Sequence, residues 1–565
     1  MEPLPQNPKL SHTKSISVVT SRSVEVGEDG ANKPAGRRKR EMRKFEGRTT
    51  AGLEPTPSDD KDDPLNWPRW KKEAAYASLL LMTGTICVLK TLYVTTNSVI
   101  VAQYNSSYMA VTAFTGIPFI IAAFSSLGSM MLSQIIGKRI IFIVSSLLMF
   151  GGVLWNMHIF STYSWFMRQV HERRLRFSIL NIVSLVFTWG SPILGGFISQ
   201  TNETFRNQLM VLSIIQAFVV FFTVLLIPET SFDRSQTISA GPSPTSGISA
   251  FGTTTITTIS ANQSSPLKIY LKSLHPLRYT ARFSLNSTLQ PIRALGAPSA
   301  LLTFLLTGLM IASAYGVANS LSEIFAAMPT FLFPERLGYI FILPLIFSVI
   351  VYALTSYISY QRSKPPHHLS RSSTPDNLIV VVPAFLSLLI GIAGLLSFGL
   401  YVEGELTPKV VDDGTVFALD VTGLNLSLTT VSALFGMLVT GSTLIHLASS
   451  AYLSSSSFPT PSGNSNHGET LLQPSRAVLE NILVGIFIVA FPSWVKGSEG
   501  SMEGLKDTAI AIAVLQIVLA STVGALLYVK GDVLRAVDRR VLGIRQDERM
   551  GRVLSWKSEG SFFEA

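Results

Sequence analysis

The chain has 565 residues, of which 47% are hydrophobic and only 14% charged, and its formal net charge is +10. Soluble proteins carry about 25% charged residues, so this composition excludes a soluble enzyme and a disordered chain. Cys87 is the only cysteine, which excludes an internal disulfide and a cysteine metal cluster. Membrane proteins gather basic residues on their cytoplasmic side, so the net charge does not indicate a nucleic-acid partner.

The N-terminal segment, residues 1–70, is polar and rich in Pro, Ser and charges, which predicts a disordered cytoplasmic tail. No apolar stretch follows Met1, so the sequence predicts no cleaved signal peptide. The basic run from Arg37 to Arg40 is compatible with a nuclear signal or a lipid-binding patch. A basic cytoplasmic flank ahead of the first span is the simpler interpretation.

Apolar blocks follow, and most have at least the roughly 20 residues that a helix needs to cross a bilayer. An N-terminal bundle, residues 71–228, holds the blocks at about 74–101, 109–132, 138–160, 177–198 and 207–228. A polar linker, 229–298, leads to a C-terminal bundle, 299–530, with blocks at about 300–323, 337–360, 377–401, 424–452, 476–494 and 507–529. Residues 531–565 are expected to be a cytoplasmic tail. These blocks are too long and too uniformly apolar for barrel strands, so the sequence predicts an all-α membrane protein with about 11 transmembrane helices in two bundles.

Basic residues in short loops set the orientation of the spans. The N-terminal tail, the loop with Lys138 and Arg139, the long linker, the loop after Tyr360 and the C-terminal tail are basic, which predicts that they are cytoplasmic. The remaining loops then face outward. Two of them contain the sequons at Asn105 and Asn202, which predicts glycosylation at these positions.

The basic segment from Arg168 to Arg176 conflicts with this topology. Its charge predicts a cytoplasmic position, yet only one span separates it from Arg139, whereas two cytoplasmic loops need an even number of crossings between them. Three explanations remain open at this point. The loop lies outside, the chain lacks a span, or residues 155–170 form a partial re-entrant piece.

Four motifs in chain order resemble the major facilitator superfamily, and in particular its fungal drug/proton antiporter-like members. Residues 63–71 (DPLNWPRWK) resemble the family's D-P-x-N-W-x-x-W-x-K entry sequence. Residues 190–196 (GSPILGG) resemble the antiporter motif G-P-x-x-G-G of the family's fifth helix, and the matching residues are Gly190, Pro192, Gly195 and Gly196. Residues 228–230 (PET) resemble the end of the sixth helix, and residues 374–378 loosely resemble the P-E-x-R-L sequence before the ninth. The resemblance spans about 62–540 and implies two helical bundles that rock about a central site.

The chain departs from the family pattern in two places. The loop motif G-x-x-x-D-R-x-G-R-R is matched at Gly128, Gly137, Lys138 and Arg139, but residues 133–134 (SQ) stand where its charged pair is expected, which implies a weaker latch. By comparison with the family pattern, the segment that would form the fourth helix is missing from the sequence. Residues 170–173 resemble the sequence that follows that helix, while residues 160–167 resemble the end of the third. This gap coincides with the conflict in the charge pattern.

Ionisable residues inside the spans are the first candidates for a transport pathway. Lys90 lies in the middle of the first span, where it could attract an anionic substrate or lose a proton, although a water-filled cavity or a structural pair would also accommodate it. Glu323 is a candidate outer coupling acid, and a hydrated position at a helix end is its simpler explanation. His446 is a candidate proton relay or a hydrogen-bonded residue. Glu480 is explained by an ion pair with Arg476 one turn before it.

The aromatic residues Trp189 and Tyr315 are candidate cavity liners, whereas interfacial belts explain the other tryptophans. We find no G-K-[ST] phosphate loop, no H-x-x-x-H or Cys–His set and no catalytic pair in the sequence. We therefore expect no cofactor, no metal and no enzymatic activity.

The sequence thus predicts a transporter that moves a small organic molecule, drug-like or a metabolite, by alternating access with proton coupling, as in antiport or multidrug efflux. Its expected partners are the lipid bilayer, the small-molecule substrate and protons, and the sequons favour the plasma membrane over internal membranes. The alternative is a degenerate relative without transport activity, or a gene prediction that omits an exon near Met167.

Overall fold

A computed structural model describes residues 67–158, 175–199, 206–228, 288–326, 330–362, 376–406, 426–455, 467–496 and 504–542. All of these residues belong to one compact unit, Glu54–Ala565. Most of the predicted tails, most of the linker, Asn202, most of the basic segment before Leu175 and parts of three family motifs lie outside the described residues. Residues 531–541, predicted as the start of the C-terminal tail, instead continue the last helix, Gly504–Val541. The elements in the described ranges are helices, as the sequence predicts.

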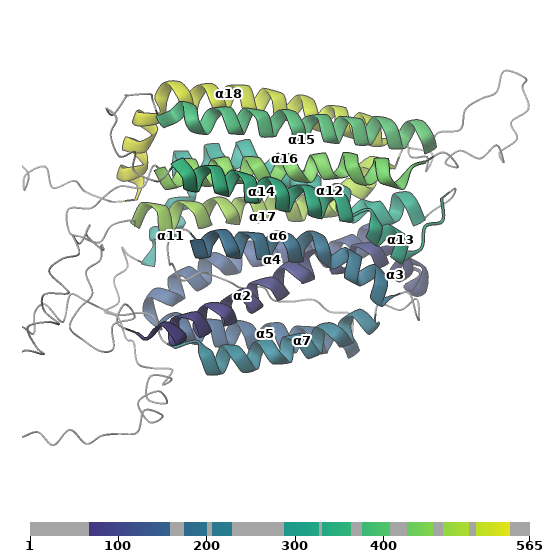
Figure 1. The fold of residues 1–565 in the computed structure, drawn as a ribbon, viewed down its shortest axis with the longest axis horizontal. Coiled ribbons are helices and arrows are strands. Elements are labelled where there is room, and N and C mark those ends of the chain that lie inside the picture. The colour runs from purple at the N-terminus through teal and green to yellow at the C-terminus, as the bar shows by residue number, and fades with distance from the viewer. Residues whose placement is uncertain are drawn as a thin grey trace, which may run out of the picture. The chain divides into compact units, whose positions relative to one another are not determined.

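The first half of the chain places a helix on each of its predicted spans (Figure 1). The first span is broken into α2 (Arg69–Thr91), the 3₁₀ turn η2 (Leu92–Thr96) and α3 (Asn97–Tyr104). The others are α4 (Tyr108–Ile135), α5 (Lys138–His158), α6 (Leu175–Ile198) and α7 (Arg206–Leu226).

The second half also places a helix on each predicted span. It consists of α11 (Gln290–Leu295), α12 (Pro298–Ala326), α13 (Pro334–Tyr339), α14 (Ile342–Arg362), α15 (Asp376–Leu406), α16 (Leu428–Ser455), α17 (His467–Val495) and α18 (Gly504–Val541). The predicted span 337–360 is therefore split between α13 and α14. The last helix, α18, bends at Lys530, whose φ is −119° and ψ is 20°.

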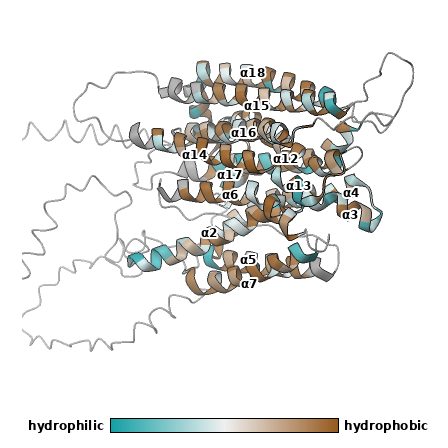
Figure 2. Cartoon of the chain, turned by 45° about the vertical axis from the view of Figure 1, so that its right-hand side comes forward, coloured by the Kyte–Doolittle hydropathy of each residue, from teal (hydrophilic) through white to brown (hydrophobic). Residues whose placement is uncertain are grey.

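Ten helices in the described residues are long and apolar enough to cross a membrane. Hydrophobic residues cover most of the helix lengths, whereas hydrophilic ones gather at ends such as the start of α2 (Figure 2). Large apolar side chains on α7 are more than half exposed, including Ile214, Phe218 and Phe221. Such surfaces are stable against lipid rather than water, so the chain is a multi-pass membrane protein.

The two halves meet along defined helix pairs. The helix α4 packs on α17, while α6 packs on α13 and α14. The break at η2 brings the first span against α12. The largest hydrophobic core lies mainly in the second half, and it includes Val94, Phe119 and Trp189 from the first half. We call the end of the helices that carries Arg69, Arg139 and α11 the inner end, and the end with α3 and α13 the outer end (Figure 1).

The consecutive described helices α5 and α6 run in the same direction. At the start of α5, Arg139 Nη2 donates to the Val224 carbonyl at the end of α7 (3.1 Å). At the end of α6, the Gly195 carbonyl accepts from Gln208 Nε2 at the start of α7 (2.7 Å). Both helices are therefore antiparallel to α7.

This arrangement bears on the start of α6. The start of α6 lies at the same end of the helices as Arg139. The second half of the chain shows how a fourth long helix packs against the second and third. There α16, the fourth long helix, packs against both α14 and α15, whereas no described helix of the first half packs in this way against α4 and α5. The described part of the first half thus lacks a counterpart of α16.

Candidate functional site

Side chains from both halves meet around Lys90, in the second half of α2. Its ammonium lies 5.7 Å from the centroid of the Phe119 ring of α4. Its charge also interacts with Tyr315 of α12 and Glu480 of α17. Among the described residues, no carboxylate oxygen lies within ion-pair distance of this ammonium. We call this region the central site.

Aromatic rings form one wall of the central site. The Tyr315 ring centroid lies 5.5 Å from Phe119 and 5.5 Å from Trp189 of α6, and Trp189 lies 5.8 Å from Phe435 of α16. Tyr315 and Lys90 are partly exposed, whereas Trp189 is buried behind Tyr315. The structure therefore brings Lys90, Tyr315 and Trp189 together, with Trp189 supporting the wall rather than forming its surface.

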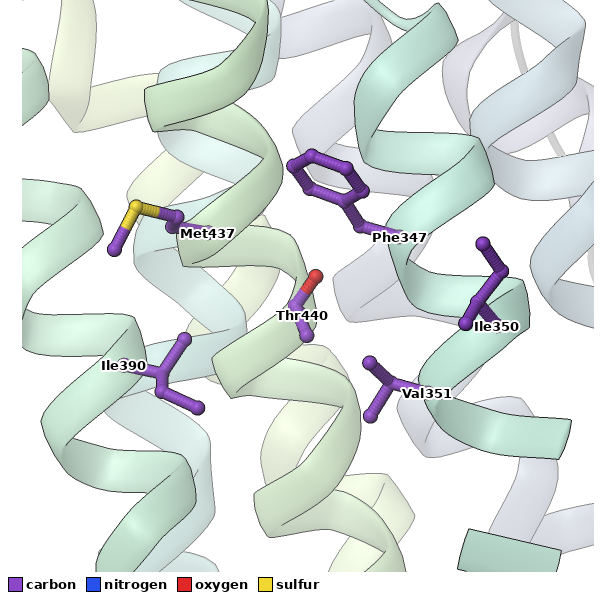
Figure 3. A pocket seen from close by; sticks show the side chains of 6 residues that line it. All are labelled: Phe347, Ile350, Val351, Ile390, Met437 and Thr440. Atoms are coloured by element: carbon purple, nitrogen blue, oxygen red, sulfur yellow. The ribbon is translucent and has the colours of Figure 1, made fainter. Parts of the chain in front are cut away.

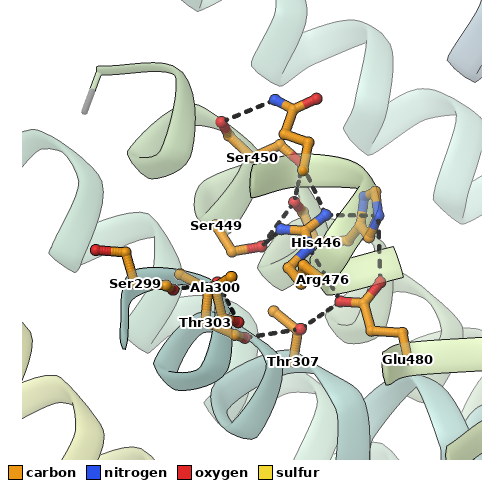
Figure 4. Close-up of polar contacts among 10 residues, drawn as sticks. Ser299, Ala300, Thr303, Thr307, His446, Ser449, Ser450, Arg476 and Glu480 are labelled. Carbon is orange, nitrogen blue, oxygen red and sulfur yellow. Dashed lines mark hydrogen bonds and ion pairs between the residues drawn. The ribbon is translucent and has the colours of Figure 1, made fainter. Parts of the chain in front are cut away.

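A polar network joins side chains of α12, α16 and α17 (Figure 4). The charges of Lys90 and Glu480 interact, and Lys90 also acts on His446. Arg476 Nε lies 3.2 Å from Glu480 Oε1, which confirms the predicted pair. Thr307 donates to the same carboxylate oxygen (2.5 Å), and Arg476 Nη2 also donates to Ser450 Oγ (3.0 Å). Arg476 and Glu480 are both buried, so these partners supply the contacts that water would otherwise give.

The contact between His446 and Arg476 fixes the protonation of the imidazole. Arg476 Nη2 lies 2.9 Å from His446 Nε2. A guanidinium can only donate, so Nε2 accepts and carries no proton in this arrangement. The same nitrogen lies 3.9 Å from Glu480 Oε2. His446 keeps 42% of its side-chain surface exposed.

A second ionic cluster closes the outer end. Lys496 Nζ lies 2.7 Å from Glu323 Oε1, and it lies 5.8 Å from the Tyr108 ring centroid of α4. Tyr108 in turn donates to Ser322 Oγ of α12 (3.1 Å). Glu323 is only 4% exposed, so its simpler explanation as a hydrated helix end is wrong. This cluster connects α4 of the first half to α12 and α17 of the second.

The glycines of the antiporter-like motif lie where α6 contacts both halves. A Cβ on Gly195 would lie 2.5 Å from the Leu92 carbonyl of η2, and a Cβ on Gly196 would lie 2.5 Å from the Pro334 carbonyl of α13. Pro192 presents its own carbonyl to Gly338 of α13. Gly190 is looser, since its Cβ would meet only the Leu345 side chain at 3.6 Å. The motif thus lets three backbone segments approach closely at the outer end.

The loop motif is distributed differently from its predicted position. Gly128 lies inside α4, and nothing lies within 4 Å of a Cβ built on it. Gly137 forms the turn between α4 and α5 with a φ of 98°, which favours glycine. Lys138 is exposed, and the buried Arg139 reaches α7. Only the second part of the motif therefore forms the inner loop.

The outer loop between α3 and α4 contains Asn105. This residue adopts a left-handed conformation with a φ of 47°, and its side chain is exposed. Such a position is accessible to modification.

An apolar hollow of about 210 Å³ lies between α14, α15 and α16 (Figure 3). Thr440 provides its polar side chain, and this hydroxyl donates to the Gly436 carbonyl (2.7 Å). The other lining residues are Phe347, Ile350, Val351, Ile390 and Met437. The hollow offers no convergent polar groups, and it does not overlap the central site.

Several members of these clusters are absent from the sequence predictions, among them Phe119 and Lys496. Both act through partners more than a hundred residues away, Tyr315 and Glu323, so no local pattern indicates them. Within the described residues, no group of three or more His, Cys, Asp or Glu side chains is placed to hold a metal ion.

Comparison with known proteins gives a partial match. No family model matches the chain. Over 211 residues it is 24% identical to an uncharacterised MFS-type transporter of Schizosaccharomyces pombe, where MFS denotes the major facilitator superfamily. This match covers 33% of the chain and 36% of that relative, so the chain spans about a third of its length.

Solved structures with a similar fold include a POT family transporter in complex with 5-aminolevulinic acid (12% identity, TM-score 0.48, 82% of this chain and 98% of that one). They also include a nucleoside transporter (12% identity, TM-score 0.45, 80% and 99%). The names of these proteins, like that of the Schizosaccharomyces pombe relative, describe them as transporters.

Proposed function

We propose that the chain is a transporter of the major facilitator type that moves a small organic molecule by alternating access, with proton coupling. The observation that carries this proposal is the central site, where Lys90 of the first half lies beside the Phe119 ring, which in turn packs on Tyr315 of the second half. A site shared by two bundles can open to either side when the bundles rock.

The outer end supplies the closing contacts that this mechanism requires. The Tyr108–Ser322 hydrogen bond and the Gly196–Pro334 approach join the two halves there. The Glu323–Lys496 pair lies within the second half and holds Lys496 beside the Tyr108 ring of the first half. Opening to the outside then requires the contacts between the halves to separate. Glu323 and His446 are the titratable groups placed to couple that movement to protons.

The test of alternating access uses a removable lock. A Cβ on Gly338 would lie 3.3 Å from the Ile193 Cα, which suits a disulfide across α6 and α13. We would combine Ile193→Cys and Gly338→Cys with Phe119→Cys as a reporter, in a Cys87→Ala background. Site-resolved mass spectrometry would measure labelling of position 119 by a membrane-impermeant thiol reagent added outside.

The expected result is no labelling at position 119 under oxidising conditions and labelling after reduction. Equal labelling in both conditions contradicts alternating access. Uptake of labelled organic compounds into proteoliposomes, with and without an imposed pH gradient, then tests coupling. Absence of any gradient-dependent flux favours the degenerate relative. We further propose that Asn105 is a glycosylated outer residue and that the protein resides in the plasma membrane.

A further inference from the structure

The charges at the central site do not balance. Lys90 and Arg476 are cations, and Glu480 is the one carboxylate that the described residues bring to them. Arg476 and Glu480 already pair at 3.2 Å, so Lys90 is left facing the Phe119 ring at 5.7 Å. A cation in the middle of a span is costly without a counter-charge, and a bound anion would remove that cost.

The surroundings of Lys90 favour an anion with an organic body. Phe119 and Tyr315 present aromatic surface beside the ammonium, with Trp189 packed behind Tyr315. Apolar walls with one convergent charge are typical of a site for a small organic molecule. A carboxylate near Lys90 and an apolar body against these rings satisfy both features.

His446 connects this anion to a proton. The charged groups that face it are Arg476 and Glu480 of α17 and Lys90 of α2. Among the described residues, the other helices packed on α16 (α12, α14 and α15) bring no charge within ion-pair distance of it. A proton on Nε2 ends its acceptance from Arg476 Nη2 and makes it a donor toward Glu480 Oε2, 3.9 Å away. One guanidinium N–H is then free to bind an anion.

We propose that the central site binds a small organic carboxylate together with a proton on His446, so that anion and proton cross the membrane in the same direction. This inference rests on the proposed function and specifies its substrate class and direction of coupling. The coupling is reciprocal, because a proton that strengthens anion binding is itself held more tightly when the anion is bound.

The experiment measures ligand binding to the full-length protein in detergent. Lactate, succinate and citrate would serve as carboxylate probes, with glucose as the neutral probe and tetraphenylphosphonium as the cationic probe. Thermal shift and calorimetry at pH 5.5 and 7.5 would report affinity. We expect at least one carboxylate to bind at least about tenfold more tightly at pH 5.5, and the other two probes not to bind.

Variants separate the roles of the residues. Lys90→Gln should weaken carboxylate binding at both pH values by about tenfold or more, and His446→Gln should abolish the pH dependence. The matched control is Lys506→Gln, which changes an exposed lysine at the start of α18 and should bind as the wild type does. Thermal unfolding without ligand checks that each variant is folded.

Three results would overturn the inference. They are no carboxylate binding at either pH, carboxylate binding that Lys90→Gln and His446→Gln leave unchanged, and preferential binding of the cationic probe. The Ile193–Gly338 lock is scored without ligand, so alternating access can survive these results, and loss of carboxylate specificity stays distinguishable from loss of transport function.

Discussion

Gly116 of α4 and Gly485 of α17 face each other across the two halves of the molecule. A Cβ on Gly116 would lie 2.6 Å from the Gly485 carbonyl, and a Cβ on Gly485 would lie 2.6 Å from the Gly116 carbonyl. The backbones of α4 and α17 are thus in direct contact at the interface between the two halves. Such an approach depends on glycine at both positions, because van der Waals packing rather than hydrophobicity joins helices in lipid.

Gly485→Ala should destabilise the protein because its methyl group would collide with the Gly116 carbonyl. Overpacking of this kind costs about 1–3 kcal/mol. Thermal unfolding in detergent measures the loss. Gly128→Ala is the matched control on α4, since nothing lies within 4 Å of its Cβ, and it should leave the melting temperature unchanged or slightly raised. Equal loss in both variants would mean that the contact is unimportant.

The antiporter-like motif allows a comparison within one helix. Gly196→Ala should separate α6 from α13, since its Cβ would lie 2.5 Å from the Pro334 carbonyl. Gly190→Ala meets only a side chain at 3.6 Å and should be tolerated. We expect Gly196→Ala to increase outside labelling of a cysteine at position 119, because the outer end closes less completely. Identical labelling in the two variants would contradict a closing role.

The sequence predicts the helices well and their connection poorly. Each apolar block falls on a helix because length and hydropathy are local properties. The direction of α6 depends on contacts such as Gln208 with Gly195, and charge counting alone left its inner end undecided. The 3₁₀ turn at η2 carries no Pro or Gly, so its sequence gives no local signal of a break.

The central site could be predicted only in part. Lys90 and His446 stand out because ionisable residues are rare in spans, and Arg476 with Glu480 follows helical spacing. Lys90 and Glu480 are almost four hundred residues apart, so their proximity is set by the packing of the halves. The pairing of Glu323 with Lys496 has the same cause, and the simpler expectation of a hydrated carboxylate failed for that reason.

Glu480→Gln should destabilise the second half by leaving Arg476 buried without a counter-charge. Breaking a buried pair on one side costs about 3–5 kcal/mol. The double variant Arg476→Gln with Glu480→Gln should recover part of this loss, because neither side chain then carries an uncompensated charge. Thermal unfolding of the two variants tests the prediction, and a double variant less stable than Glu480→Gln would oppose it.

Lys496→Gln should weaken closure of the outer end. The variant removes the ammonium that lies 5.8 Å from the Tyr108 ring of the first half, so one contact between the halves is lost. It also leaves the buried Glu323 without its ammonium partner, so the conformation in which this carboxylate becomes hydrated gains population. We expect faster outside labelling of a cysteine at position 119, and Lys496→Arg should restore the wild-type rate. The same labelling rate in all three proteins would show that Lys496 does not hold the outer end closed.

The inner end of α18 provides a pH-dependent contact outside the membrane-spanning segments. Asp538 is buried, and its Oδ1 accepts from the Ser299 backbone N–H at the start of α12 (3.1 Å). Burial raises the pKa of this carboxyl above its usual value, and the hydrogen bond from Ser299 opposes that shift only in part. The folded protein therefore holds the proton more tightly than the unfolded chain does.

The stability contributed by Asp538 is fully present below the unfolded pKa of about 3.9 and is lost as the pH rises through the folded pKa. The melting temperature in detergent should fall over that window. Asp538→Asn should flatten the profile, because its amide oxygen can still accept from Ser299 and carries no charge. Asp507→Asn, an exposed change at the other end of α18, should keep the wild-type slope. An unchanged slope in Asp538→Asn would assign the pH dependence to other groups.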